Sequence, residues 1–201
     1  AAFLHQLQAV PAPASGPRSS GFLLLPACDK LLPMTSPFAR LELLLGPAAL
    51  PRLARARVLI AGLGAVGAAA AESLARSAVG HLVLVDFDEI RAANLNRHPF
   101  AFHSTLGEKK AAAAARFLRD INPDADITPL ALFLDARTAP QLLAEHPCDV
   151  LIDAIDALNP KTDLLLTAQQ AQVPFILTCL GAARRIDPTR FVAADLAASH
   201  T

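Results

Sequence analysis

The sequence lacks an excess of either charge, because its 201 residues contain 18 lysines and arginines and 18 aspartates and glutamates. A balanced chain has no net field to attract nucleic acid or an anionic membrane, although a local basic patch could still bind nucleic acid. Hydrophobic residues make up 53% of the chain and charged residues 18%, which excludes general disorder. The length is enough for one domain of ordinary size with a substantial core.

Cysteine is scarce, and Cys28, Cys148 and Cys179 form no CxxC pair. Such a sparse, odd-numbered set fits reduced thiols in the cytoplasm better than a disulfide framework or a zinc site. The six histidines lack paired spacing, which argues against a histidine-bound metal. The apolar run at residues 22–26 is too short to span a bilayer and lacks the other features of a signal peptide. We therefore expect a cytoplasmic protein with no membrane contact.

Methionine occurs once, at Met34, and the 33 residues before it contain five prolines. We expect residues 1–33 to be disordered or to be a leader that is not native. Residues 34–201 are expected to form the folded domain. Because residues 198–201 carry no cap or closing element, we expect this domain to be truncated at its C-terminus.

Apolar runs alternate with helical segments from residue 57 onward. Strands are predicted at 57–62, 81–86, 127–132, 149–153 and 174–179, and helices at about 65–78, 107–121, 138–145 and 160–172. Two short helices are predicted within residues 38–56, and an antiparallel extension within 185–196. Buried, non-alternating strands between helices predict a Rossmann-like α/β fold, with a mostly parallel sheet, helices on both faces and an N-terminal helical segment.

The sequence GLGAVG at residues 62–67 follows the first strand and opens a helix, as a nucleotide-binding glycine fingerprint requires. Gly62 permits a tight turn, Gly64 lets the backbone approach a phosphate, and Gly67 lets the helix pack against the strand. The helix N-terminus offers unpaired N–H groups to an anion. The motif therefore indicates a nucleotide, against the alternative of a structural glycine-rich turn, but does not say which nucleotide.

Charged residues after the second strand separate two classes of nucleotide enzyme. Asp86 ends that strand, where an acid can accept hydrogen bonds from ribose hydroxyls, and a dehydrogenase would share this feature. Arg97 and Lys110 follow, and they suit an adenylating enzyme, in which fixed cations and usually Mg²⁺ stabilise charge at the α-phosphate and on the departing pyrophosphate. Asp156, at the edge of a later strand, is a candidate carboxylate ligand for that Mg²⁺.

The series GLGAVG, VDFD, NLNR, GEKKA, INP and DAID resembles the family of ubiquitin-activating-type adenylyltransferases that also serves thiamine and molybdopterin synthesis. Within this family, FARLELLLG, VLIDAIDALNPK and GAARRIDPTRFVAADLA are most similar to bacterial tRNA threonylcarbamoyladenosine dehydratases. The resemblance covers about residues 37–198. It implies an ATP- and Mg²⁺-dependent homodimer that adenylates the threonyl carboxylate in tRNA and then cyclises it, a net dehydration.

The resemblance also implies a role for each matching residue. Arg97, Lys110 and Asp156 would be catalytic, and Asp156 would bind Mg²⁺. Arg40 would reach into the partner subunit's site. The residues expected to contact ATP are Gly62, Gly64 and Gly67 at the phosphates, Asp86 at the ribose with Asp88 beside it, and Asn94, Arg97 and Lys110 at the phosphates.

Other interpretations stay open. The closest rival adenylates the C-terminal glycine of a ubiquitin-like sulfur carrier, which would then be the partner instead of tRNA. A rival of another class is an NAD-binding dehydrogenase or an inactive nucleotide-binding module. Among single residues, Lys110 could be a helix-surface lysine and Arg97 a solvated loop charge. Asp153 is expected to be a structural acid, and Cys179 a small buried hydrophobe rather than a nucleophile.

Overall fold

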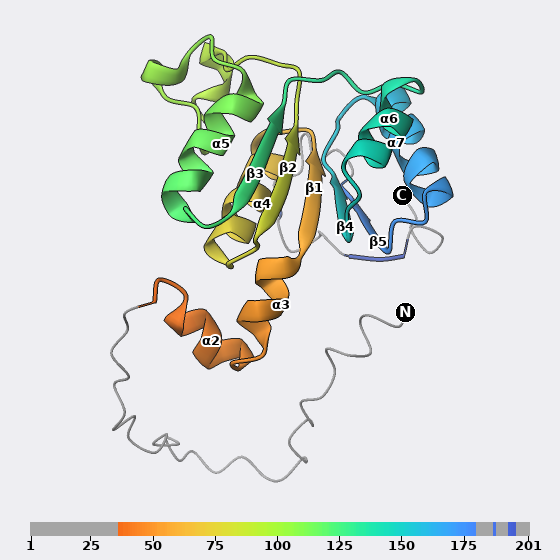
Figure 1. The fold of residues 1–201 in the computed structure, drawn as a ribbon. Helices are drawn as coiled ribbons and strands as arrows, with labels where there is room; N and C mark the ends of the chain where they lie inside the picture. The colour runs from red at the N-terminus through yellow and green to blue at the C-terminus, as the bar shows by residue number, and fades with distance from the viewer. Residues whose placement is uncertain (1–35, 180–186, 188–192, 196–201) are drawn as a thin grey trace, which may run out of the picture. The chain divides into compact units, whose positions relative to one another are not determined.

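The computed structural model describes residues 36–179, 187 and 193–195. Within these residues five strands form one sheet in the order β3-β2-β1-β4-β5, and every pairing is parallel (Figure 1). The strands are β1 (Arg57–Ala61), β2 (His81–Val85), β3 (Asp126–Leu130), β4 (Val150–Asp153) and β5 (Phe175–Thr178). The predicted Rossmann-like α/β fold with a parallel sheet is confirmed.

Helices cover both faces of the sheet. They are α2 (Ala39–Leu45), α3 (Ala49–Arg55), α4 (Ala65–Arg76), α5 (Lys110–Ile121), α6 (Thr138–Glu145) and α7 (Leu158–Gln170), with short 3-10 helices η1 (Ala92–Asn94) and η2 (His103–Thr105). On one face, α4 and α5 pack their alanine-rich sides over Val58 and Ile60 of β1. On the other face, α6 and α7 pack over Leu59 and Ala61 (Figure 1). Because both faces of β1 are buried, its sequence is continuously apolar rather than alternating.

The start of α5 differs from the prediction, because the helix begins at Lys110 and not at Gly107. Gly107 has a positive φ of 86° and donates its N–H to the carbonyl of Ile90. Lys109 forms an antiparallel bridge with Glu89, so this segment pairs with the chain after β2 instead of coiling. The lysine at position 110 therefore becomes the first residue of the helix.

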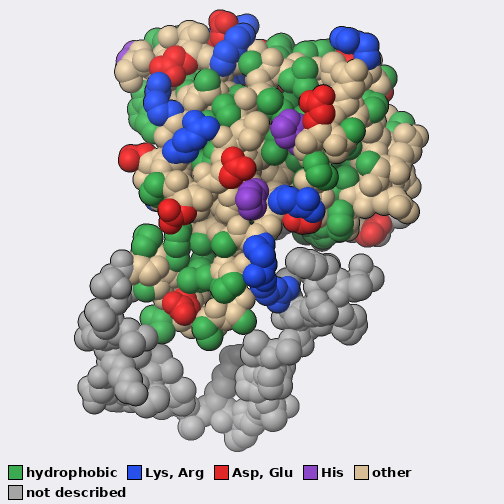
Figure 2. Space-filling model, viewed as in Figure 1, with side chains coloured by type: hydrophobic (Ala, Val, Ile, Leu, Met, Phe, Trp, Pro, Cys, Tyr) green, Lys and Arg blue, Asp and Glu red, His purple; other side chains and the backbone are tan. Residues whose placement is uncertain are grey.

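Contacts divide the chain into two units, Ala1–Met34 and Thr35–Thr201. Residues 1–33 and most of the extension expected at 185–196 lie outside the described residues. None of the helices in the described part of the chain has the length and hydropathy needed to cross a membrane. Acidic and basic side chains are interspersed over the face of the molecule in Figure 2.

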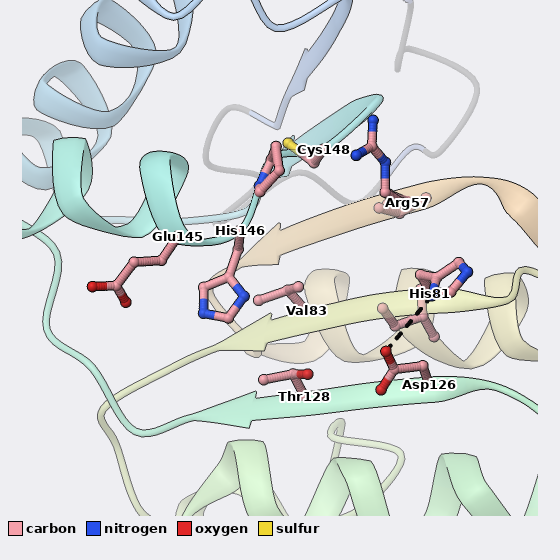
Figure 3. Close-up of a pocket in the computed structure, with 11 residues that line it drawn as sticks. Arg57, His81, Val83, Asp126, Thr128, Glu145, His146 and Cys148 are labelled. Carbon is pink, nitrogen blue, oxygen red and sulfur yellow. Dashed lines mark ion pairs between the residues drawn. The ribbon is translucent and has the colours of Figure 1, made fainter.

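A groove of about 190 Å³ lies at the amino ends of the strands (Figure 3). Arg57, His81 and Asp126, the first residues of β1, β2 and β3, lie on one side of it, and residues 145–148 lie on the other. Nucleotides bind open α/β sheets outside the carboxyl ends of the strands, so this groove is at the wrong edge for the predicted site. Burial raises the pKa of the Cys148 thiol here, which keeps it protonated.

Candidate functional site

The carboxyl ends of β1, β2 and β4 bring the predicted site residues to one edge of the sheet. Ala61, the last residue of β1, is in register with Val85 on one side and with Asp153 on the other. The glycine loop that follows β1 therefore lies between the acid that follows β2 and the loop that follows β4. This edge is the nucleotide-binding position of an open parallel sheet.

The three fingerprint glycines have different surroundings. Gly62 has a φ of +88°, and a Cβ there would lie 2.7 Å from the carbonyl oxygen of Ala154. A Cβ on Gly67 would lie only 1.9 Å from the carbonyl oxygen of Gly62. A Cβ on Gly64, by contrast, would meet nothing within 4 Å. The fold itself requires glycine at 62 and 67, whereas at 64 the open side of the backbone is where a ligand can approach.

Asp86 fastens the glycine loop to the end of β2. Its Oδ2 accepts a hydrogen bond from the Leu63 N–H at 2.7 Å, and its Oδ1 accepts one from the Asp88 N–H at 2.8 Å. The side chain is buried, and these two hydrogen bonds give the acid that is expected to bind a ribose a structural role as well. Each carboxylate oxygen still has a second lone pair for a ligand hydroxyl.

Lys110 points from the start of α5 to the same carboxylates. Its Nζ lies 2.9 Å from Asp88 Oδ2 and 3.9 Å from Asp86 Oδ2, and only 9% of its side chain is exposed. The exposed lysine is Lys109, which pairs with Glu89 at 3.1 Å. Lys110 therefore holds a buried positive charge beside the glycine loop.

Asn94 and Arg97 lie in and just after η1. The Asn94 Oδ1 accepts a hydrogen bond from the Arg91 N–H at 2.9 Å, so this side chain closes the turn. The Arg97 guanidinium is exposed and donates to the Ala93 carbonyl at 2.6 Å and to Asn96 Oδ1 at 3.1 Å. Among the described residues, no carboxylate forms an ion pair with Arg97, so its charge is available to an anion.

Asp153 and Asp156, the two acids of the DAID sequence, differ in exposure. Asp153 is fully buried, and its Oδ2 accepts hydrogen bonds from Lys161 Nζ at 2.5 Å and Thr178 Oγ1 at 2.7 Å. Its Oδ1 accepts one from the Ile155 N–H at 3.0 Å, which shapes the loop after β4. Asp156 is exposed at the end of that loop. Asp153 is thus structural, and Asp156 is the acid that a ligand can reach.

Lys161 was not singled out from the sequence. It is buried on α7, and its Nζ also donates to Thr178 Oγ1 and to the Cys179 carbonyl, both at 3.1 Å. All three of its N–H groups therefore have acceptors, and the side chain joins the ends of β4 and β5. The available signal was a lysine in the first turns of a helix that follows a strand-end acid.

His98 is a second residue missed from the sequence. It is 5% exposed, with its Nε2 2.8 Å from the carbonyl oxygen of Leu63 and its Nδ1 3.1 Å from the Phe100 nitrogen. Burial lowers its pKa, which keeps the ring neutral. A histidine next to a candidate phosphate-binding arginine was the only sequence signal.

Two aromatic rings pack together just beyond the carboxyl ends of β2 and β3. Phe87 follows β2, Phe133 follows β3, and their rings pack edge to face with centroids 5.0 Å apart. Both side chains are about half exposed, at 48% and 49%. The carboxyl edge of the sheet therefore presents an apolar surface next to its charged groups.

Arg40 does not lie at the edge of the sheet where the other predicted site residues of the same chain meet. It is exposed on α2, ahead of the amino end of β1. Phe38, at the start of α2, lines a hollow with Gly80, His81 and Asp126, all at the amino ends of strands. Arg40 thus precedes the amino end of β1, whereas the glycine loop follows the carboxyl end of that strand.

In the described residues, no group of three histidine, cysteine or acidic side chains is arranged to hold a metal ion. Asp156 nevertheless fits Mg²⁺, because this ion is commonly held by one or two carboxylates together with the phosphates of a substrate. A nucleotide at the glycine loop would supply those phosphates.

The comparison with protein families decides the membership of the chain. The ThiF family model matches residues 38–184. The chain belongs to the ThiF family. Its relatives include the tRNA threonylcarbamoyladenosine dehydratase of Bacillus subtilis, 38% identical over 168 residues, which are 84% of this chain and 65% of the relative. The molybdopterin-synthase adenylyltransferase of Escherichia coli is 38% identical over 131 residues, 65% of this chain and 51% of the relative.

Among solved structures, this ThiF-family chain is similar to the E. coli tRNA N6-threonylcarbamoyladenosine dehydratase in complex with ATP. The TM-score is 0.77 with 34% identity, and the match covers 81% of this chain and 66% of that one. The chain thus spans slightly less than two thirds of the length of these dehydratases. The family resemblance inferred from the motifs is confirmed.

Proposed function

We propose that the protein uses ATP to adenylate a carboxylate, and that this carboxylate is the threonyl group of threonylcarbamoyladenosine in tRNA. The observation that carries the proposal is the pairing of an open Gly64 backbone with the positive charge of Lys110 at one sheet edge. The dehydratase names of the relatives in Bacillus subtilis and E. coli support the choice of substrate.

The proposed chemistry has two balanced steps. A carboxylate oxygen forms a bond to the α-phosphorus of ATP while the bond to pyrophosphate breaks. The carbamoyl oxygen then bonds to the activated acyl carbon, AMP leaves, and one proton is lost, so that the nucleoside loses one water overall. Positive charge near the α-phosphate lowers the barrier of the first step, because negative charge builds up there and on the leaving pyrophosphate.

Each residue has a task in this scheme. The N–H groups at the start of α4 and the Gly64 backbone would bind phosphate. Lys110 would exchange part of its bonding to Asp88 for a phosphate oxygen, and Arg97 would contribute the second cation. Bound Mg²⁺, held by Asp156 and phosphate oxygens, would neutralise charge on the triphosphate. Phe87 and Phe133 would supply apolar contact for the adenine.

We also propose a homodimer in which Arg40 completes the partner's site. Next to Arg40, Leu43, Leu44 and Leu45 are 71%, 78% and 53% exposed, an apolar surface that a second copy could bury. Mixing inactive Arg40→Ala and Asp156→Asn proteins should restore part of the activity, since one hybrid site then contains both residues. A monomer in sedimentation measurements, or no restored activity, would contradict this arrangement.

A sulfur-carrier adenylyltransferase is the second candidate, favoured by the similarity to the molybdopterin-synthase enzyme. In that case the adenylated group would be the C-terminal carboxylate of a small protein. The cationic groups would serve both substrates equally. A dehydrogenase is disfavoured, because hydride transfer has no use for Lys110 and Arg97 at the phosphates.

The deciding experiment supplies ATP, Mg²⁺ and tRNA that bears threonylcarbamoyladenosine. We expect AMP release together with loss of one water mass from the nucleoside. Asp156→Asn and Arg97→Ala should each slow turnover by orders of magnitude, roughly the 10²–10³-fold typical for loss of one group that stabilises transition-state charge. The exposed residues Asp124→Asn and Arg52→Ala are matched controls. Pyrophosphate release from ATP with a sulfur-carrier protein, and none with the tRNA, would replace the dehydratase proposal.

A further inference from the structure

The Leu63 peptide in the glycine loop is held on both sides. Its N–H donates to Asp86 Oδ2 at 2.7 Å, and its carbonyl oxygen lies 2.8 Å from His98 Nε2. The Phe100 N–H donates to the other ring nitrogen, Nδ1, at 3.1 Å, so Nδ1 must be the unprotonated acceptor. The proton of the neutral ring is therefore on Nε2, which donates to Leu63.

The imidazole joins two segments that carry predicted phosphate contacts. His98 follows Arg97 directly, and the loop of residues 62–67 contains Leu63. Among the hydrogen bonds within the described residues, the bond from His98 to Leu63 is the only one between residues 91–98 and this loop. The position of Arg97 relative to the glycine loop therefore depends on this ring, because Arg97 itself is exposed and bonded only within its own turn.

We propose that neutral His98 is a positioning residue, which fixes the segment that carries Arg97 to the glycine loop, and that acid weakens this connection. The inference rests on the proposed function for the identity of the reaction, and adds a residue and a pH dependence to it. Protonation would put a hydrogen on Nδ1 against the Phe100 N–H, and two donors would then face each other. Repulsion between these two N–H groups would push the ring away and weaken the hydrogen bond from Nε2 to the Leu63 carbonyl.

The charges around the ring decide the direction of the pH effect. Burial is the main cause that lowers the pKa of His98, and Lys110 and Arg97 lower it further, whereas the Leu63 carbonyl and Asp86 oppose this. Because the pKa is below the ordinary histidine value of about 6.5, the folded protein keeps the neutral ring at pH 7. The positioning should fail only as the pH falls below that value.

His98→Gln and His98→Leu test the proposal. Glutamine can donate to Leu63 and accept from Phe100 but does not titrate, whereas leucine can do neither. We expect His98→Leu to lower kcat by roughly tenfold to a hundredfold, the range for a small misplacement of a reacting group, with a smaller change in the KM for ATP. His98→Gln should keep kcat near the wild-type value and remove the decline attributable to His98 below pH 6.5. His103→Gln, at an exposed histidine, is the matched control.

The outcomes separate positioning from mere stability. If His98 only stabilised the fold, His98→Leu would lower Tm and the active fraction but leave kcat per active site unchanged, which would overturn the proposal. An unchanged acid decline in His98→Gln would also overturn it. Nitrogen NMR of the imidazole should show the Nε2–H tautomer, and ATP titration should show weaker binding by wild type at acidic pH but not by His98→Gln. These two measurements decide the proposal even if tRNA proves not to be the substrate.

Discussion

Removal of the Lys161 ammonium should destabilise the protein strongly. In Lys161→Met the side chain keeps its length, but Asp153, which is fully buried, loses its only ion-pair partner among the described residues. An unpaired buried charge costs about 3–5 kcal/mol when one partner of a buried pair is removed. A whole domain is stable by only about 5–15 kcal/mol, so this loss is a large part of the total free energy of unfolding.

The expected size can be measured by thermal and urea unfolding. For a chain of this length, Tm falls by about 2–4 °C for each kcal/mol, so a decrease of roughly 6–20 °C is expected. The double variant Lys161→Met/Asp153→Asn should recover much of this loss, because the neutral amide can still accept the Ile155 N–H. Lys109→Met, at an exposed lysine paired with Glu89, should change stability by less than about 1 kcal/mol. A Tm of Lys161→Met within two degrees or so of wild type, or a double variant as unstable as the single one, would refute the reasoning.

The glycine loop and the amino-end ion pair give two further tests. Gly67→Ala should unfold at a clearly lower temperature than wild type, because its Cβ would meet the Gly62 carbonyl oxygen at 1.9 Å. Gly64→Ala should keep the wild-type Tm but bind ATP more weakly in calorimetry. Equal losses of Tm in the two variants would contradict this difference between the two glycines. The hydrogen bond from Arg57 lowers the pKa of Asp149, so the pair stabilises the fold above the ordinary aspartate pKa of about 3.9 and loses this effect as pH falls further. Asp149→Asn should therefore lower Tm by a small amount at pH 7 and by nothing near pH 2, and a Tm difference independent of pH would exclude this cause.

The fold could be predicted from the sequence because each strand is a short apolar run between helical segments. The prediction began α5 about three residues too early, because Gly107 and Lys109 are bonded to the chain after β2, a pairing that local periodicity does not report. The segments of the candidate site could also be predicted, because the ends of the strands were recognised from the sequence. The residues after the ends of parallel strands must meet at one edge, so the glycine loop and Asp86 could be placed together.

His98 and Lys161 could not be found in this way. The partner of His98 is a backbone carbonyl 35 residues earlier, and backbone carbonyls leave no mark in a sequence. Lys161 sits in a helix that otherwise looks like an ordinary sheet-covering helix, and its acceptors come from the ends of two strands. In both cases the tertiary fold creates the environment, and the residue type alone does not reveal it.

The open space around Gly64 has a consequence for how such chains diverge. Glycines 62 and 67 are fixed by the backbone around them, so any folded descendant must retain them whatever it does. Position 64 carries no such steric demand, because a Cβ there would clash with no neighbouring atom of the fold. A lineage that no longer bound nucleotides would be free to replace Gly64 first. The residue type at position 64 is therefore a simple marker of whether a descendant still binds phosphate at the glycine loop.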